Sequence, residues 1–92
     1  MAFHRCTIHD ATGTLVCENV SLTLEEAERS GAVEWYGTVS VSHTTPLMPG
    51  STYRIVLDNG RTGEFEVRRN TMAGGERGTE RAVAICGTGK LV

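Results

Sequence analysis

Residues 51–69, STYRIVLDNGRTGEFEVRR, decide the fold, because they hold the clearest β-hairpin pattern in the chain. Apolar and polar residues alternate in two runs, and the turn-forming tripeptide Asp58-Asn59-Gly60 lies between them. Such alternation is typical of two antiparallel strands that turn one face to a core and the other to water. The sequence therefore predicts an antiparallel β protein built around this hairpin.

The register of the hairpin follows from its apolar residues. A three-residue loop that ends in a left-handed glycine pairs Tyr53 with Phe65 and collects the large apolar side chains on one face. A two-residue loop would instead set Ile55 opposite Glu64. Because a slip of one residue would expose the whole apolar set, we predict the bulged three-residue loop, with Ile55 opposite Gly63.

The composition fits one small globular domain that spans residues 1–92. A hydrophobic content of 39% and a charged content of 22% are too apolar for a disordered chain. The formal net charge of −2 argues against a sequence-independent nucleic-acid binder, which needs a basic face to neutralise phosphates.

The cellular location is predicted from segments that the sequence lacks. No apolar run approaches the ~20 residues that cross a bilayer, and the first ten residues lack the apolar core of a signal peptide. Three cysteines, an odd number, fit reduced thiols better than an extracellular disulfide framework. We therefore expect a soluble cytoplasmic protein that engages no membrane.

The rest of the chain predicts a small barrel. Outside the hairpin, strand-like runs cover residues 3–9, 14–20, 33–42 and 81–86. Short strands at this spacing are typical of an all-β, six-stranded antiparallel barrel or a folded-over sandwich. For the first two strands, a four-residue loop places Cys6 opposite Cys17, and a three-residue loop sends the two thiols to opposite faces. Both registers remain open, and we favour the first.

A short helix is expected between the second and third strands, over residues 24–30. Thr23 and Glu26 form a capping-box pattern, in which each side chain bonds the backbone amide of the other residue. Arg29 suits the negative end of a helix, and Gly31 suits a left-handed stop. A helix of two turns is marginal alone, so it would have to dock on the sheet.

The core is predicted from the alternation within each strand. The residues expected to face inward are Ile8, Trp35, Val39, Val41, Tyr53, Ile55, Leu57, Phe65, Val67, Val83 and Ile85. Gly37 lies in the middle of its strand and suggests a bulge or a tight bend.

Two loops differ in character. Residues 43–50, HTTPLMPG, carry both prolines and two apolar residues, Leu47 and Met48. Residues 70–80 are rich in glycine and charge, so we expect a mobile loop centred on residues 74–78.

The sequence contains no strong motif for chemistry. The histidines and cysteines lack metal-ligand spacing, so we predict no metal site and no cofactor. The run GTGK at residues 87–90 matches the end of a phosphate-binding loop, but Ala84 stands where that loop needs its first glycine. No nucleophile has an identifiable base beside it, so we do not expect an enzyme.

Residues 19–24, NVSLTL, resemble the Asn/Asp-x-Ser-x-x-Gly element of PilZ domains, with Asn19 and Ser21 at its first two defined positions. Leu24 stands at the glycine position. Pro49-Gly50, before a strand, is also similar to that family. The resemblance implies a six-stranded barrel and the binding of a cyclic dinucleotide.

For function we predict a non-catalytic β-barrel module that binds a protein partner or self-associates. Its expected contact residues are Leu47 and Met48, because exposed apolar groups on a loop often mark a contact surface. The alternative for both residues is that they cap an open end of the barrel. The alternative is a PilZ-like barrel that binds a small ligand, with candidate polar groups Arg5, His9, Asn19 and Ser21. An uncharacterised enzyme is the second alternative.

Overall fold

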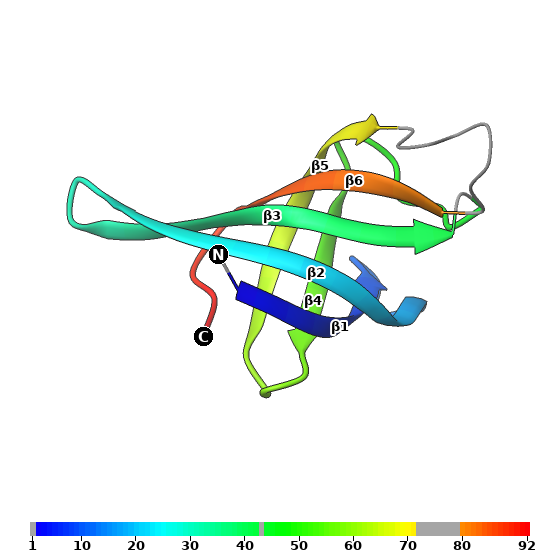
Figure 1. Ribbon diagram of the computed structural model, residues 1–92, viewed down its shortest axis with the longest axis horizontal. Helices are drawn as coiled ribbons and strands as arrows, with labels where there is room; N and C mark the ends of the chain where they lie inside the picture. The colour runs from blue at the N-terminus through cyan, green and yellow to red at the C-terminus, as the bar shows by residue number, and fades with distance from the viewer. Residues whose placement is uncertain (1, 43, 72–79) are drawn as a thin grey trace.

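The computed structural model describes residues 2–42, 44–71 and 80–92, and these form a closed six-stranded antiparallel barrel. The strands are β1 (Ala2–Asp10), β2 (Leu15–Arg29), β3 (Ala32–Ser42), β4 (Thr52–Leu57), β5 (Thr62–Thr71) and β6 (Glu80–Gly87). Their order around the barrel is β1-β2-β3-β6-β5-β4, and β1 pairs with β4 to close it (Figure 1). The predicted all-β barrel is confirmed. Most of the loop expected to be mobile, residues 72–79, lies outside the described residues.

β4 and β5 form the predicted hairpin in the predicted register. Tyr53 pairs with Phe65, and Ile55 pairs with Gly63. Gly60 has a φ of 91°, the left-handed conformation that the bulged loop requires. The rings of Tyr53 and Phe65 stack with centroids 5.7 Å apart. The apolar pattern therefore determines this register.

The expected helix over residues 24–30 is wrong, because β2 continues through this segment to Arg29. Residues 21–29 all pair with β3, and Arg29 lies opposite Ala32. Ser30 and Gly31 make the turn with φ values of 53° and 81°, and positive φ at both positions is typical of a type I′ hairpin. Pairing along β3 outweighs a two-turn helix that is marginal alone. The described residues contain no helix, and therefore no helix that is long and apolar enough to cross a membrane.

The β1–β2 register matches neither of the two loops considered from the sequence. Cys6 pairs with Val20 and Ile8 pairs with Cys17, so β2 carries one extra residue between these pairs. Asn19, at a φ of 55°, lies in this bulge. The favoured pairing of Cys6 with Cys17 is therefore wrong. Both cysteines are free thiols.

The predicted core is confirmed, since every residue expected to face inward is buried. Trp35 is 1% exposed and packs its ring edge-on against Phe65. The core also contains residues that the prediction left out: Cys6, Leu22, Leu24, Leu47 and Leu91.

Gly37 has a different role from the one expected. It pairs with Leu24, and the register of β2 and β3 shows no shift there. A Cβ at this position would collide with the backbone carbonyl of Thr23. The glycine therefore allows two backbones to approach closely, and it does not mark a bulge.

Two buried leucines close the two ends of the barrel. Leu47, in the connection from β3 to β4, is fully buried. The Tyr53 hydroxyl holds this connection, because it accepts from the Met48 amide at 3.0 Å and donates to the Pro46 carbonyl at 3.2 Å. Leu91 closes the opposite end, where residues 88–92 continue from β6 along the start of β5.

Candidate functional site

The outer part of the β2–β3 hairpin, which we call the ribbon (residues 25–35), departs most clearly from a plain barrel. It projects beyond the other strands, and the longest dimension of the molecule, 42 Å, runs along it (Figure 1). Residues 26–34 are all exposed. The ribbon therefore contributes surface to the molecule and little core.

Both edges of the ribbon lack a neighbouring strand among the described residues. β1 pairs with β2 only as far as Leu24. β6 pairs with β3 only as far as Tyr36, because the chain stays with β5 at Gly87 and leaves β3. The backbone groups of residues 32–35 that point away from β2 are thus open to another strand.

A hollow of about 560 Å³, which we call the edge hollow, lies beside this open edge of β3. Its lining comes from the ribbon, from the β4–β5 turn and from residues 90–92. The apolar part of the lining is Ala32, Val33, Trp35, Leu91 and Val92. Val33 is 55% exposed and Val92 is 72% exposed. An apolar side chain that entered the hollow would remove this surface from water.

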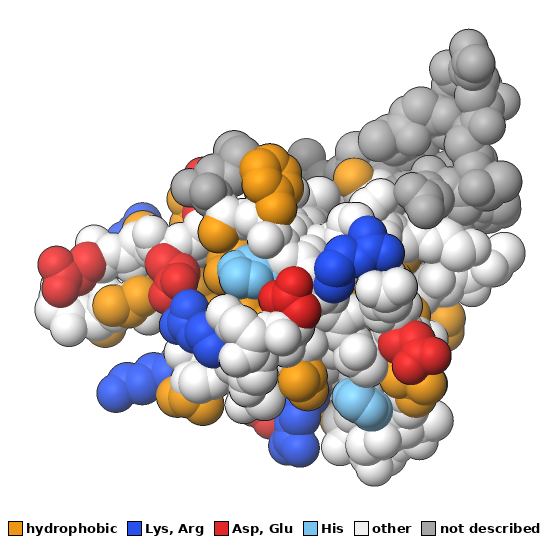
Figure 2. All heavy atoms as spheres, turned by 60° about the horizontal axis from the view of Figure 1, so that its bottom comes forward, with side chains coloured by type: hydrophobic (Ala, Val, Ile, Leu, Met, Phe, Trp, Pro, Cys, Tyr) orange, Lys and Arg blue, Asp and Glu red, His pale blue; other side chains and the backbone are white. Residues whose placement is uncertain are grey.

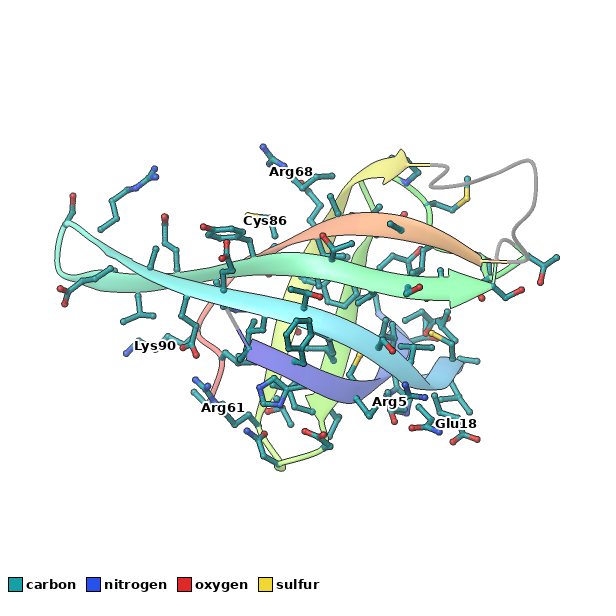
Figure 3. All side chains as sticks on the ribbon, viewed as in Figure 1. Arg5, Glu18, Arg61, Arg68, Cys86 and Lys90 are labelled. Atoms are coloured by element: carbon teal, nitrogen blue, oxygen red, sulfur yellow. The ribbon has the colours of Figure 1, made fainter. Side chains whose placement is uncertain are left out.

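An ion pair fixes one wall of the edge hollow. The two Nη atoms of Arg61 donate to the Glu26 carboxylate at 3.0 and 3.2 Å, and Nη2 also donates to the Leu91 carbonyl at 3.0 Å. The bond to Arg61 lowers the pKa of Glu26 and raises the pKa of Arg61. Lys90 also lines the hollow, and within the described part of the chain it forms no ion pair. Figure 3 shows Arg61 and Lys90 near the chain that follows β6.

The ribbon carries more acidic than basic side chains. Its charged residues are Glu25, Glu26, Glu28, Arg29 and Glu34. Arg29 lies 3.5 Å from Glu34. A hydrogen bond to Glu25 raises the pKa of Tyr36, so that this phenol stays protonated. A basic partner would meet an attractive field here.

The structure brings three of the predicted binding residues together on β1 and β2, and we call them the Arg5 cluster (Arg5, Asn19 and Ser21). Arg5 Nε donates to Asn19 Oδ1 at 3.0 Å, and Nη2 donates to the Asn19 carbonyl at 2.7 Å. Arg5 Nη1 donates to Ser21 Oγ at 2.9 Å. The bulge in β2 exposes both acceptors of Asn19 to the same guanidinium.

Carboxylates lie next to the Arg5 cluster. Asp58 accepts a bond from the Arg5 amide at 3.2 Å, and its Oδ1 lies 3.0 Å from Nδ1 of His4. These bonds lower the pKa of Asp58, and the bond to His4 has the largest effect. Glu18 and Asp58 both line the adjoining hollow of about 220 Å³, and Figure 3 shows Glu18 at the same end of the molecule as Arg5. Acidic and basic side chains are interspersed on the face in Figure 2, with no large patch of one sign.

The other predicted binding residues lie apart from this cluster. Leu47 is fully buried, so its side chain offers no surface, whereas Met48 beside it is 60% exposed. His9 lines a hollow of about 680 Å³ on the outside of β4 and β5. Its lining includes the charged residues Arg54, Glu64 and Lys90, and Arg54 lies 3.7 Å from Glu64 there. The binding roles expected for these residues stay predictions.

Two of the three thiols, those of Cys6 and Cys17, offer little reactivity. Burial raises the pKa of Cys6 to about 12 and also raises the pKa of Cys17, which favours the thiol over the nucleophilic thiolate. Among the described residues, no three or more His, Cys, Asp and Glu side chains gather in a group that could hold a metal ion.

Sequence reasoning missed the ribbon, although two signals for it are present. Leu22 and Leu24 alternate with polar residues at a period of two, as in a strand, and Ser30-Gly31 is a turn dipeptide. Beyond Leu24 the residues are polar on both faces, so periodicity gives no further guide. The point where β6 leaves β3 has no sequence signal.

Comparison of the chain with protein-family models, with curated proteins and with solved structures finds no match.

Proposed function

We propose that this protein is a non-catalytic interaction module that binds an extended segment of a partner protein along the open edge of β3. The observation that carries the proposal is the position of residues 32–35, which pair with β2 and have no partner strand on their other side among the described residues, beside the edge hollow. An added strand would bond to this edge through its backbone and place alternate side chains in the hollow. Backbone bonds supply affinity in such complexes, and the hollow supplies selectivity.

The chemistry of the site defines the partner segment. The apolar lining of the edge hollow favours an apolar side chain such as Leu, Ile or Phe. Lys90 at the same hollow disfavours insertion of a basic side chain. The acidic ribbon favours basic residues on either side of the inserted one. We therefore expect an extended segment with a central apolar residue and basic flanks.

Selection of peptides from a displayed random library against the immobilised full-length protein tests this function. Enriched peptides should bind the wild type and lose about tenfold or more in affinity for Val33→Asp, because the substitution puts a charge into the edge hollow. The matched control is Leu15→Asp, at a residue that is 51% exposed on another part of the barrel. Absence of enrichment, or equal losses in the two variants, would overturn the proposal.

A second candidate function is the binding of a cyclic dinucleotide, which the convergence of Arg5, Asn19 and Ser21 favours. Two features oppose it. The guanidinium already donates to three acceptors within the protein, and Asp58 and Glu18 would repel a phosphate. Calorimetry with cyclic dinucleotides at high micromolar concentration decides the matter. Saturable heat that disappears in Arg5→Ala would favour this function, and an absence of heat would exclude it.

A further inference from the structure

Residues 88–92, which we call the closing segment, lie on the barrel as an added strand. The Thr62 amide donates to the Val92 carbonyl at 2.7 Å, and the Val92 amide donates to the Thr62 carbonyl at 2.8 Å. The Thr88 amide donates to the Glu64 carbonyl at 2.9 Å. The segment thus continues beyond the end of β6 along the first residues of β5, in the manner of a bound peptide.

Side chains from elsewhere in the barrel complete an acceptor site for this segment. Trp35 Nε1 donates to the Gly89 carbonyl at 2.9 Å, and Arg61 Nη2 donates to the Leu91 carbonyl at 3.0 Å. Leu91 is 8% exposed. A Cβ at Gly63 would lie 3.0 Å from both the Leu91 and the Trp35 side chains, so this glycine makes room for the leucine. The acceptor site therefore binds the backbone of the closing segment and one apolar side chain, that of Leu91.

The closing segment buries few side chains in comparison with the strands. Thr88, Gly89 and Lys90 are exposed, and Leu91 is the one buried side chain that the segment carries. Glycines at positions 87 and 89 give the chain the backbone freedom to redirect the segment. The same contacts would form if the segment came from another copy, so exchange costs little net contact energy.

We propose that the end of the barrel is a strand-acceptor site, and that the closing segment of a second copy fills it in exchange for its own. Lys90 of the incoming segment would lie at the acidic ribbon of the accepting copy just as it lies at its own, so the exchange keeps this attraction. The intramolecular segment competes at a local concentration in the millimolar range, so exchange becomes appreciable at comparable protein concentrations. This inference rests on pairing with Thr62 and Glu64 of β5. It shares Trp35 and residues 90–92 with the edge hollow, but it does not require a strand to bind at the open edge of β3.

Cysteine cross-linking between copies tests the exchange. Two variants, Thr62→Cys and Val92→Cys, are prepared in the full chain with Cys17→Ser and Cys86→Ser, so that the introduced thiol is the accessible one and the remaining Cys6 is buried. Circular dichroism checks that each variant folds. Mixed at about 1 mM under mild oxidation, they should give about tenfold more disulfide-linked heterodimer than the control pair Thr52→Cys and Val92→Cys. Peptide mass spectrometry should find the link between positions 62 and 92.

Equal heterodimer yields from the test pair and the control pair would overturn the exchange. That result would leave peptide binding at β3 intact, because the cross-link reports pairing with β5 and not the occupancy of the backbone of residues 32–35. Conversely, a peptide selection without enrichment would overturn the proposed function alone. A cross-link between positions 62 and 92 would then still support the exchange.

Discussion

Gly87 controls how closely the chain can pack at the end of the barrel that Leu91 closes. A Cβ at this position would overlap the Trp35 indole ring, whereas a Cβ at Gly89 would meet no atom within 4 Å. Gly87→Ala should therefore lower the free energy of unfolding by about 1–3 kcal/mol through overpacking. The control Gly89→Ala should change it by less than about 0.5 kcal/mol. Urea unfolding measures both variants, and equal losses would contradict the packing of Trp35 on Gly87.

Asp58 should make the stability of the protein depend on pH. Its pKa is lowered by its bonds to His4 and to the Arg5 amide, so the folded state favours the carboxylate. A lowered pKa contributes stability above the unfolded value of about 4, and this contribution disappears as the pH falls through the folded value. Wild type should therefore lose its stability advantage over Asp58→Asn below about pH 4.

The comparison with Asp58→Asn isolates this residue, because Asp10 and Glu26 also have lowered pKa values and titrate in both proteins. Denaturant unfolding at several pH values between about 2 and 7 measures the difference between the two proteins. A difference that stays constant over this range would show that the bonds to His4 and Arg5 contribute no stability.

At the scale of the element, the ribbon depends on its turn. Ser30 has a φ of 53°, a conformation that costs a residue with a β-carbon about 1–2 kcal/mol. Asn is favoured at this position of a type I′ turn. Ser30→Asn should therefore stabilise the ribbon by about 0.5–1 kcal/mol and slow amide exchange in residues 25–35 about two- to fivefold. Ser30→Val should speed the same exchange, and an unchanged rate in both variants would contradict the turn.

The ribbon also shows where element prediction from sequence fails. Thr23 and Glu26 satisfy a helix-capping pattern, which depends on local sequence alone. The competing strand is stabilised by pairing with β3, which no local pattern contains. The β4–β5 hairpin was predictable because one of its faces is buried, so that the alternation of Tyr53 and Ile55 with polar residues reports its register.

At the scale of the whole molecule, closure of the barrel explains which parts the sequence could predict. Closure buries one face of each strand, so alternation identified much of the core, including Trp35 and Phe65. Leu47 and Leu91 were missed because they lie in segments outside the strands, where no periodicity applies. The short PilZ-like pattern was the one sequence signal that placed Arg5, Asn19 and Ser21 in a common site. No sequence signal predicted the edge hollow, since it depends on three segments that meet only in the fold.

Removal of the ribbon should leave the barrel folded. Replacement of residues 28–33 by Asn-Gly joins Ala27 to Glu34 through a two-residue turn. These two residues pair two positions away from Arg29 and Ala32, so they are a hydrogen-bonded pair of the same kind as the one that closes the natural turn. All the deleted residues are exposed, so the melting temperature should change by less than about 5 °C. Thermal unfolding followed by circular dichroism measures this change. A large loss would show that the ribbon stabilises the barrel and is more than a surface for binding.

The most direct test of the proposed function is hydrogen exchange of the backbone amides of residues 32–35 in the full-length protein, with and without a peptide enriched in the selection. Added-strand binding predicts that saturating peptide slows exchange at this edge about tenfold or more, with smaller changes around Leu91 and Val92. Amides near Arg5 and Ser21 should keep their rates. Protection at the Arg5 cluster with unchanged rates at residues 32–35 would contradict the account.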